Sequence, residues 1–269
     1  MLKDITIGQY FPVDSLLHRM DPRFKIVETM LFIVMLFIGN SFGVLALGAV
    51  FVLLAQRLSN IPMKMIWKSI RPILPILAIT AVLNLLFIDD GDVLFQWKIL
   101  KVTEGGITTS LFMMIRIILL IIGSSLLTYT TSPILLTDAI ESLLSPLKRV
   151  KFPVHEMAMM MSIALRFIPT LLEETDKIMS AQKARGATLD NGKLTERAKA
   201  LIPILIPLFV SAFRRAEELA TAMECRCYRG GEGRTRLRTL KAAPRDYIGF
   251  AVCLLFLAAA VVLNLILTS

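Results

Sequence analysis

Cysteine and histidine are scarce in this chain, which has three Cys and two His among 269 residues. Three cysteines (Cys225, Cys227 and Cys253) cannot form a disulfide framework and are typical of free thiols in a reducing cytoplasm. The Cys225/Cys227 pair lacks a second group of ligands at metal-site spacing, and His18 and His155 stand alone. We therefore expect neither disulfides nor a metal centre.

Motifs for catalysis and energy conversion are also missing. The sequence contains no Gly-x-x-x-x-Gly-Lys-Ser/Thr loop, so it should not bind ATP through a P-loop. Its apolar segments hold almost no carboxylates, which excludes the proton relays of secondary transporters. The charged first two dozen residues do not resemble a cleaved secretory signal. We expect a non-catalytic chain without cofactors that takes energy from a partner.

Hydrophobic residues, by contrast, make up 55% of the chain, and the mean hydropathy is +0.68. These values are typical of an integral membrane protein. The whole net charge of +9 arises from residues 146–245, which hold 19 Lys/Arg and 10 Asp/Glu. Since Lys and Arg accumulate on the cytoplasmic side of membrane proteins, this region should face the cytoplasm and bind partners there.

The first long apolar stretch, Thr29 to Gln56, has no charged residue. As one helix it would be ~42 Å long at ~1.5 Å per residue, more than a ~30 Å hydrocarbon core requires and too little for two full spans. The turn signal Gly39-Asn40-Ser41 predicts a hairpin of two short spans, 26–40 and 42–56. A cytoplasmic loop should follow over 57–71, because its four cations have no acid beside them.

Three more spans are predicted at 72–88, 107–130 and within 246–269. The loop after the third span contains Asp89, Asp90, Asp92 and Glu104, which suits the outer face, so the N-terminus should be cytoplasmic and the C-terminus outside. Arg116 lies inside the fourth span. An intramembrane cation is a functional hypothesis by default, but no acid lies nearby in sequence, so we favour a structural role.

The fold class that follows is an all-α integral membrane protein with about five transmembrane helices and a coupling region of long amphipathic helices. We place a membrane domain at 1–130, a basic cytoplasmic domain at 131–245 and a last transmembrane helix at 246–269. The basic domain should begin with an amphipathic helix over 134–147, after Ser132-Pro133.

Two longer helices are predicted in the basic domain, at 155–185 and 194–228. The first is nearly all apolar in its first half and polar in its second half, and the second has an apolar run before its charged end. Pro169 should bend the first of them. The apolar run 201–213 in the second is short for a span and should be buried or interfacial. The basic tail beyond (Arg229, Arg234, Arg236, Arg238, Lys241 and Arg245) should be mainly a solvated run facing lipid headgroups.

Both long helices end in one arginine between small residues, Ala184-Arg185-Gly186 and Cys225-Arg226-Cys227, with glycine at or shortly after the end. An unobstructed guanidinium can enter a partner's groove and bind carboxylates or carbonyls with two hydrogen bonds. Alternatively each arginine complements the helix dipole only. Two helices of one design favour docking.

The chain resembles the transmembrane T component of energy-coupling factor transporters over nearly its whole length. The resemblance lies in the stretches 18–25 (His-Arg-Met-Asp-Pro-Arg-Phe-Lys), 163–169 (Ile-Ala-Leu-Arg-Phe-Ile-Pro) and 181–186, and around Arg226. It implies that two cytoplasmic ABC-type ATPase subunits bind the Ala-Arg-Gly-like motifs, and that a membrane-embedded substrate-binding S subunit completes an importer of vitamins or other micronutrients. The second motif departs from the pattern, with Cys225 and Cys227 where Ala and Gly are usual.

A methionine-rich run, Met157, Met159, Met160 and Met161, has two interpretations. Methionine fills irregular space in cores and bilayers, and Met-rich surfaces also suit recognition of several partners, here S subunits. Both interpretations stay open.

Three alternatives to a shared vitamin module were weighed. The first is a T subunit dedicated to cobalt or nickel uptake. The second is a membrane enzyme for phosphorylated lipids, which would need an acidic metal motif that the sequence lacks. The third is a nucleic-acid binder, but the basic region has few aromatic residues for base stacking. We expect a prokaryotic cell-membrane protein that binds no nucleic acid.

Overall fold

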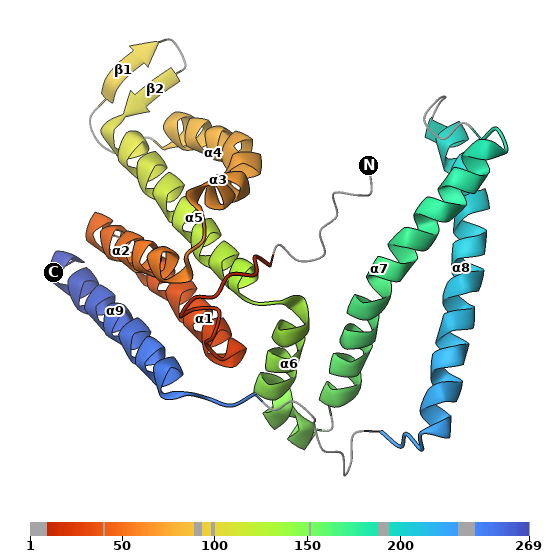
Figure 1. The fold of residues 1–269 in the computed structure, drawn as a ribbon. Coiled ribbons are helices and arrows are strands. Elements are labelled where there is room, and N and C mark those ends of the chain that lie inside the picture. The colour runs from red at the N-terminus through yellow and green to blue at the C-terminus, as the bar shows by residue number, and fades with distance from the viewer. Residues whose placement is uncertain are drawn as a thin grey trace. The chain divides into compact units, whose positions relative to one another are not determined.

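The structure is a computed structural model that describes residues 10–39, 41–88, 93–97, 100–150, 152–187, 194–230 and 240–268. The chain divides into two compact units. We call Gly8–Ala139 with Leu240–Ser269 the membrane unit, and Ile140–Thr239 with Met1–Ile7 the helix-pair unit. Figure 1 shows the helices of each.

Helices dominate the described residues, as the all-α prediction requires. In the membrane unit they are α1 (Pro22–Ile38), α2 (Phe42–Ser59), α3 (Met63–Ile70), the 3-10 turn η1 (Arg71–Ile73), α4 (Leu74–Phe87), α5 (Glu104–Thr130) and α9 (Pro244–Thr268). A small antiparallel hairpin of β1 (Val93–Trp97) and β2 (Leu100–Thr103), with Trp97 opposite Leu100, precedes α5. Helix α6 (Pro133–Leu144) and the turn η2 (Ser145–Val150) lead into α7 (Val154–Ala184) and α8 (Leu194–Cys225).

Four helical stretches in the described part of the chain are long and apolar enough to cross a bilayer. They are Phe42–Ser59, Met63–Phe87, Glu104–Thr130 and Pro244–Ile266. Helix α1 has 17 residues, or ~25 Å at ~1.5 Å per residue, so it is somewhat shorter than a ~30 Å hydrocarbon core. The prediction of an integral membrane protein is confirmed.

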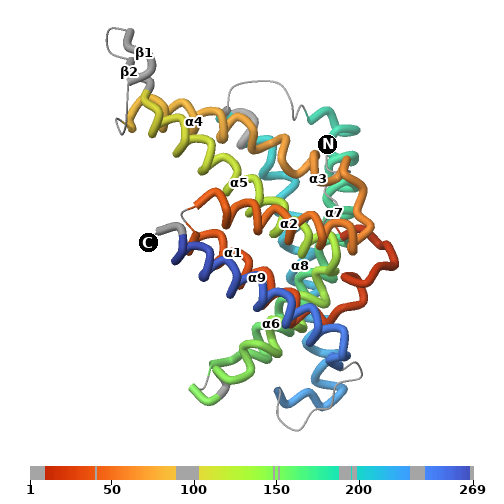
Figure 2. Tube along the Cα trace, turned by 90° about the vertical axis from the view of Figure 1, so that its left-hand side faces the viewer, coloured from red at the N-terminus to blue at the C-terminus, as the bar shows by residue number. Residues whose placement is uncertain are grey.

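The core of the membrane unit lies between α1, α2, α5 and α9, which run side by side in Figure 2. Phe32 of α1 is 2% exposed and its ring stacks on that of Phe51 of α2 with 5.4 Å between centroids. Helix α5 approaches α1 closely at Gly123, where a Cβ would lie 2.4 Å from the Phe32 ring. A larger residue at Gly123 would therefore force these helices apart.

The boundary between α1 and α2 falls at the predicted turn, since α1 ends at Ile38 and α2 begins at Phe42. Arg116 of α5 explains how α1 ends there. Its guanidinium donates a hydrogen bond of 2.5 Å to the Gly39 carbonyl oxygen and lies 4.5 Å from the centre of the Phe112 ring. A buried cation thus satisfies a carbonyl at the C-terminus of α1, which supports the structural role expected for Arg116.

The prediction of a loop over 57–71 is wrong in its secondary structure, because most of these residues are helical. Helix α2 continues to Ser59, Asn60 ends it in the left-handed conformation (φ 55°), and α3 begins at Met63. The prediction took a run of cations as a sign of a loop. In the structure Lys64 and Lys68 lie one helical turn apart on α3, whereas Ile66 and Ile70 are buried on its other face. An amphipathic helix, not a loop, carries these charges.

The predicted outer loop is described only in part. Asp89, Asp90 and Asp92 lie outside the described residues, and Glu104 opens the first turn of α5. Thr103 caps this helix by accepting a 3.1 Å hydrogen bond from the Gly106 amide, and it donates one of 2.8 Å to the Ile88 carbonyl. The capping threonine joins the end of α4 to the start of α5.

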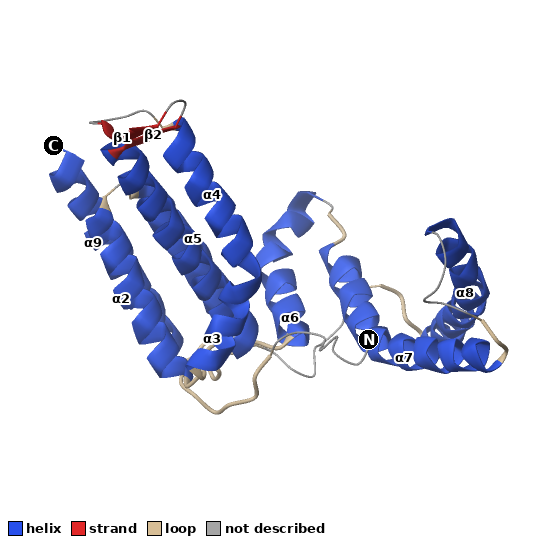
Figure 3. Ribbon diagram, turned by 90° about the horizontal axis from the view of Figure 1, so that it is seen from above, coloured by secondary structure: helices blue, strands red, loops and turns tan. Residues whose placement is uncertain are grey.

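In the helix-pair unit, α7 and α8 pack side by side and run in opposite directions (Figure 1). Arg215 of α8 donates a 2.9 Å hydrogen bond to Glu174 of α7, and Gln182 donates one of 3.4 Å to the Pro203 carbonyl. Helix α7 contains Pro169 and changes direction along its length (Figure 3), as an internal proline predicts.

Candidate functional site

The two arginine motifs lie at opposite ends of the α7–α8 pair. Arg185 ends α7, whereas Arg226 ends α8 beside the first half of α7, where it lines a hollow together with Met159 and Ile163. The helix between Ile163 and Arg185 covers ~33 Å at ~1.5 Å per residue. Each motif therefore presents a separate surface.

Helix α7 ends in a Schellman motif at the first arginine. The Gly186 amide donates to the Lys183 carbonyl (3.0 Å), and the Ala187 amide donates to the Gln182 carbonyl (3.0 Å). Gly186 takes the left-handed conformation (φ 86°), in which L side chains are strained. Arg185 is thus the C-cap residue of α7.

Helix α8 ends in the same motif. The Cys227 amide donates to the Glu224 carbonyl (2.8 Å), and the Tyr228 amide donates to the Met223 carbonyl (3.0 Å). Cys227 takes the left-handed conformation (φ 55°) that Gly186 takes on α7. Arg226 is therefore the C-cap residue of α8, and the two motifs are equivalent in backbone geometry despite the cysteines.

Both C-cap arginines are open to solvent. Ala184, Arg185, Gly186, Cys225, Arg226 and Cys227 are all exposed. Neither guanidinium makes a hydrogen bond or an ion pair with the residues that the structure describes. Since an extended cation without a partner is free to enter a binding groove, the geometry allows docking at both ends.

Arg226 lies between two hollows of the helix pair. One has a volume of about 520 Å³ and is lined on the α7 side by Met159 and Ile163. The other has a volume of about 390 Å³ and is lined by Arg166 and Phe167 of α7 together with Arg215 and Glu218 of α8. The second motif thus stands on a mixed apolar and charged surface.

The methionine-rich run lies beside the Arg226 end of the pair. Met157, Met160 and Met161 are 37%, 60% and 42% exposed, Met159 is half-buried, and Ala158 packs inward. The run therefore faces outward for the most part. One stretch of α7 consequently adjoins both the second arginine motif and an exposed apolar surface.

The sequence analysis did not predict a cluster of buried polar residues that forms at the start of α1. Lys25 is 5% exposed and donates to the Thr130 carbonyl (3.0 Å) and the Thr131 hydroxyl (3.1 Å) at the end of α5. Asp246 of α9 is 1% exposed and accepts a 3.1 Å hydrogen bond from the Asp21 amide. The cluster ties α1 to α5 and α9.

The electrostatics of this cluster favour ionised Asp21. Arg23 donates to its carboxylate at 2.7 Å and also to the Leu240 carbonyl at 3.1 Å. Burial alone would raise the pKa of Asp21, but the hydrogen bonds from the Arg23 side chain and backbone outweigh it and lower that pKa. The stretch 18–25, on which the family resemblance partly rests, thus joins the start of α1 to the end of α5 and the start of α9.

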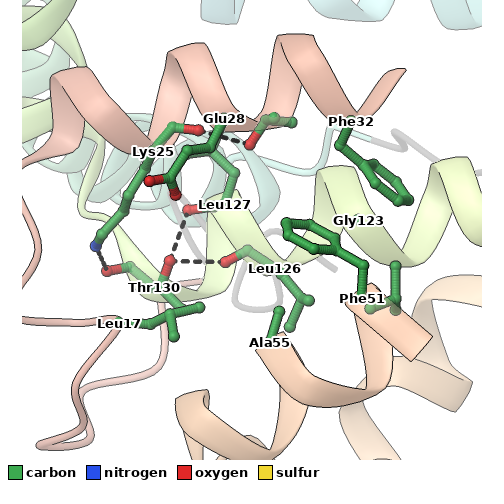
Figure 4. Close-up of a pocket in the computed structure, with 12 residues that line it drawn as sticks. Leu17, Lys25, Glu28, Phe32, Phe51, Ala55, Gly123, Leu126, Leu127 and Thr130 are labelled. Carbon is green, nitrogen blue, oxygen red and sulfur yellow. Dashed lines mark hydrogen bonds between the residues drawn. The ribbon is translucent and has the colours of Figure 1, made fainter. Parts of the chain in front are cut away.

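Glu28, the next acid along α1, is one of the few carboxylates in the predicted spans. With Lys25, Phe32 and Phe51 it lines a cavity of about 70 Å³, shown in Figure 4. Its Oε1 atom is buried without a hydrogen-bond partner among the described residues. The i, i+3 spacing of Lys25 and Glu28 was the available sequence signal.

Part of the predicted basic tail can be placed. Arg229, Lys241 and Arg245 are exposed, and Arg245 approaches Asp246 to 4.0 Å. Arg234, Arg236 and Arg238 lie outside the described residues. The exposed part of the tail is consistent with a solvated surface.

Comparison with known proteins gives one consistent family. Residues 14–237 match the family model described as cobalt transport protein. The energy-coupling factor transporter transmembrane protein EcfT of Ruminiclostridium cellulolyticum is 52% identical over 264 residues, covering 98% of each chain. EcfT of Clostridium kluyveri is 53% identical over 265 residues (98% of each), and EcfT of Bacillus subtilis is 48% identical over 259 residues (96% of this chain and 97% of its own). The chain therefore belongs to the family of energy-coupling factor transporter transmembrane proteins.

Proposed function

We propose that this chain is the transmembrane coupling subunit of an energy-coupling factor importer, with ATP hydrolysis carried out by two cytoplasmic ATPase subunits. The observation that carries the proposal is the pair of equivalent helix ends, each with one unpaired, exposed arginine at the C-cap. Separated by ~33 Å of helix, the two arginines suit two grooves on two subunits rather than one shared site.

In this mechanism each guanidinium enters the groove of one ATPase and binds carbonyls or carboxylates with two hydrogen bonds. When the ATPases close on ATP and open after hydrolysis, the two ends of the α7–α8 pair move with them. The N-terminus lies in the cytoplasm, on the side where the net charge of residues 146–245 is held.

The exposed apolar surface of the pair would pass this movement to a membrane-embedded S subunit that carries a vitamin or another micronutrient. On α7 the surface consists of Met157, Met160 and Met161, and on α8 Phe209 and Phe213 are 60% and 72% exposed. Large exposed apolar patches mark interaction sites, and flexible methionines suit S subunits of differing shape.

The test is co-purification. The double variant Arg185→Glu with Arg226→Glu, co-expressed with both ATPases, should retain less than about a tenth of the bound ATPase, because each change replaces a buried interfacial cation with a repelling charge. The matched control is Lys177→Glu with Arg214→Glu, two exposed cations on the same helices away from their ends. Normal ATPase recovery with the first variant, or equal loss with the control, would contradict the proposal.

A further inference from the structure

The membrane unit contains an apolar groove of about 230 Å³, which is lined by residues of α2, α3 and α5. The groove is lined by Val52 and Leu53 of α2, by Met63 and Ile66 of α3 and by Leu119 of α5, among others. Gln56 is the one amide among its lining residues, and it donates a 3.2 Å hydrogen bond to the Met63 sulfur. The interior of the groove therefore suits a hydrocarbon chain.

Cations border this groove along one edge of α3. At ~100° per residue the apolar positions Met63, Ile66, Trp67 and Ile70 fall on one face, and Lys64, Lys68 and Arg71 form a stripe next to Trp67. Arg57 adds a fourth cation near the end of α2, and all four are exposed. None makes a hydrogen bond or ion pair with the described residues.

Two further contacts fix α3 in this position. The Tyr129 hydroxyl of α5 donates a 3.2 Å hydrogen bond to the Met65 carbonyl and also bonds the Ser69 hydroxyl. Ile66 and Ile70 are buried against the core. These contacts hold α3, and with it the basic stripe, in a fixed position beside the groove.

We propose that this groove binds an anionic phospholipid, with an acyl chain along Val52, Leu53 and Met63 and the headgroup phosphate on Lys64, Lys68 and Arg71. Charge complementarity selects this occupant: four cations that make no ion pair with the described residues lie beside a groove whose lining is apolar apart from Gln56, in a membrane protein. Trp67 is 61% exposed between the two faces of α3 and lies near the start of the Met63–Phe87 stretch that is apolar enough to cross a bilayer, and indole rings gather at the headgroup level of such stretches. A zwitterionic lipid also brings a phosphate, but its ammonium group cancels the net charge that would attract the cations.

The chain offers a direct reporter, because it has only two tryptophans. In a Trp97→Phe background Trp67 is the sole indole, and bromine on lipid acyl chains quenches its fluorescence on contact. The full-length protein is reconstituted in phosphatidylcholine nanodiscs with rising fractions of brominated phosphatidylglycerol, or of brominated phosphatidylcholine as the reference. Half-maximal quenching should need at least about fivefold less of the anionic lipid, the effect of roughly one cation near a lipid surface.

The variant Lys64→Gln with Lys68→Gln and Arg71→Gln should lose this preference and behave alike with both lipids. A matched triple on the helix-pair unit, Lys177→Gln with Lys199→Gln and Arg214→Gln, removes the same charge at exposed positions and should keep the preference. Equal quenching by the two lipids in the parent protein overturns the proposal without any need for the variants. So does a preference that survives removal of the three cations.

If the basic stripe binds a protein rather than a lipid, co-purification and lipid quenching should respond differently to the α3 triple variant. If the α3 triple loses ATPase or S-subunit co-purification while its lipid preference is unchanged, the stripe is a protein contact and the lipid proposal is wrong. The proposal does not rest on the coupling function, since quenching is measured on the chain alone and the arginine test reads ATPase recovery.

Discussion

The membrane unit and the helix-pair unit differ in how their hydrophobic residues pack. The buried core cluster lies entirely in the membrane unit, where Phe32, Met35 and Leu36 are 2% exposed or less. The helix-pair unit leaves Met160, Phe209 and Phe213 at least 60% exposed along two helices that contact each other. Both units leave large apolar side chains exposed, with Phe87 at 78% in the first and Phe213 at 72% in the second, but the membrane unit also packs a buried core cluster between its helices.

Polar groups show the same difference. In the membrane unit Lys25, Asp246 and Arg116 are buried and hydrogen-bonded to backbone or side-chain groups of other helices, as low-dielectric surroundings require. In the helix-pair unit Arg185 and Arg226 have no partner among the described residues. Buried polar residues therefore hold the membrane unit together, whereas in the helix-pair unit Arg215 pairs with Glu174 and the two C-cap arginines remain available for binding.

The largest test of this comparison truncates one aromatic ring in each unit. Phe32→Ala should destabilise the membrane unit by about 3–5 kcal/mol, because it opens a cavity beside Phe51 and Gly123. Phe213→Ala should change the unfolding temperature little, since this ring is 72% exposed, but it should reduce S-subunit recovery. Thermal unfolding of the purified chain and co-purification measure the two effects. Similar losses of thermal stability in both variants would remove the distinction.

A smaller effect is expected at the end of α8, where Cys227 holds a conformation that costs L residues about 1–2 kcal/mol. Cys227→Gly should relax this strain and raise the stability of the helix end by up to about 1 kcal/mol, with ATPase recovery retained. Cys227→Val should act in the opposite direction, because β-branched residues are outliers at positive φ. Amide hydrogen exchange in the last turn of α8 measures the series. A variant order other than Gly, Cys, Val from slowest to fastest exchange would show that the Schellman motif does not set the stability of this end.

The smallest effect concerns the contact between α7 and α8. A hydrogen bond from Ser211 and the neighbouring Arg215 guanidinium lower the pKa of Glu174 below its ordinary value. Because the folded pKa is the lower one, this stabilisation is present above the unfolded pKa of about 4.3 and is lost as the pH falls through the folded pKa. The unfolding temperature of the parent should exceed that of Glu174→Gln at pH 6, and the gap should close on acidification.

The exposed neighbour Glu173 provides the control for that measurement. Glu173→Gln should show no such closing gap with the parent. A difference between parent and Glu174→Gln that stays constant down to pH 3 would mean that the carboxylate does not contribute to pairing of the helices.

Much of the fold was predictable because it follows from local patterns. The apolar stretches predicted where most of the long helices lie, and the Gly39-Asn40-Ser41 turn signal predicted where α1 ends and α2 begins. The prediction of a loop over 57–71 failed because net charge was read without the helical period, although Lys64, Lys68 and Arg71 follow that period. The β1–β2 hairpin is a further addition to the predicted all-α class.

The site was predictable in its residues but not in its arrangement. Residue type and spacing singled out Arg185 and Arg226, and the family resemblance suggested the roles proposed for them. That Cys227 would adopt the conformation of Gly186 could not be predicted, since cysteine has no intrinsic preference for positive φ. Similarly, Lys25 and Asp246 lie more than two hundred residues apart, and their local sequences do not predict that both belong to one polar cluster at the start of α1.

By itself, then, the sequence determined a membrane protein with a basic helical region and two arginine-ended helices, because hydropathy, charge and helix capping are local properties. Only the tertiary structure decided that α7 and α8 run antiparallel and place the arginines at opposite ends of the pair. It also decided that Arg116 meets the Gly39 carbonyl and that α2, α3 and α5 line an apolar groove together. These features depend on contacts between distant segments, which form only when burial brings the helices together.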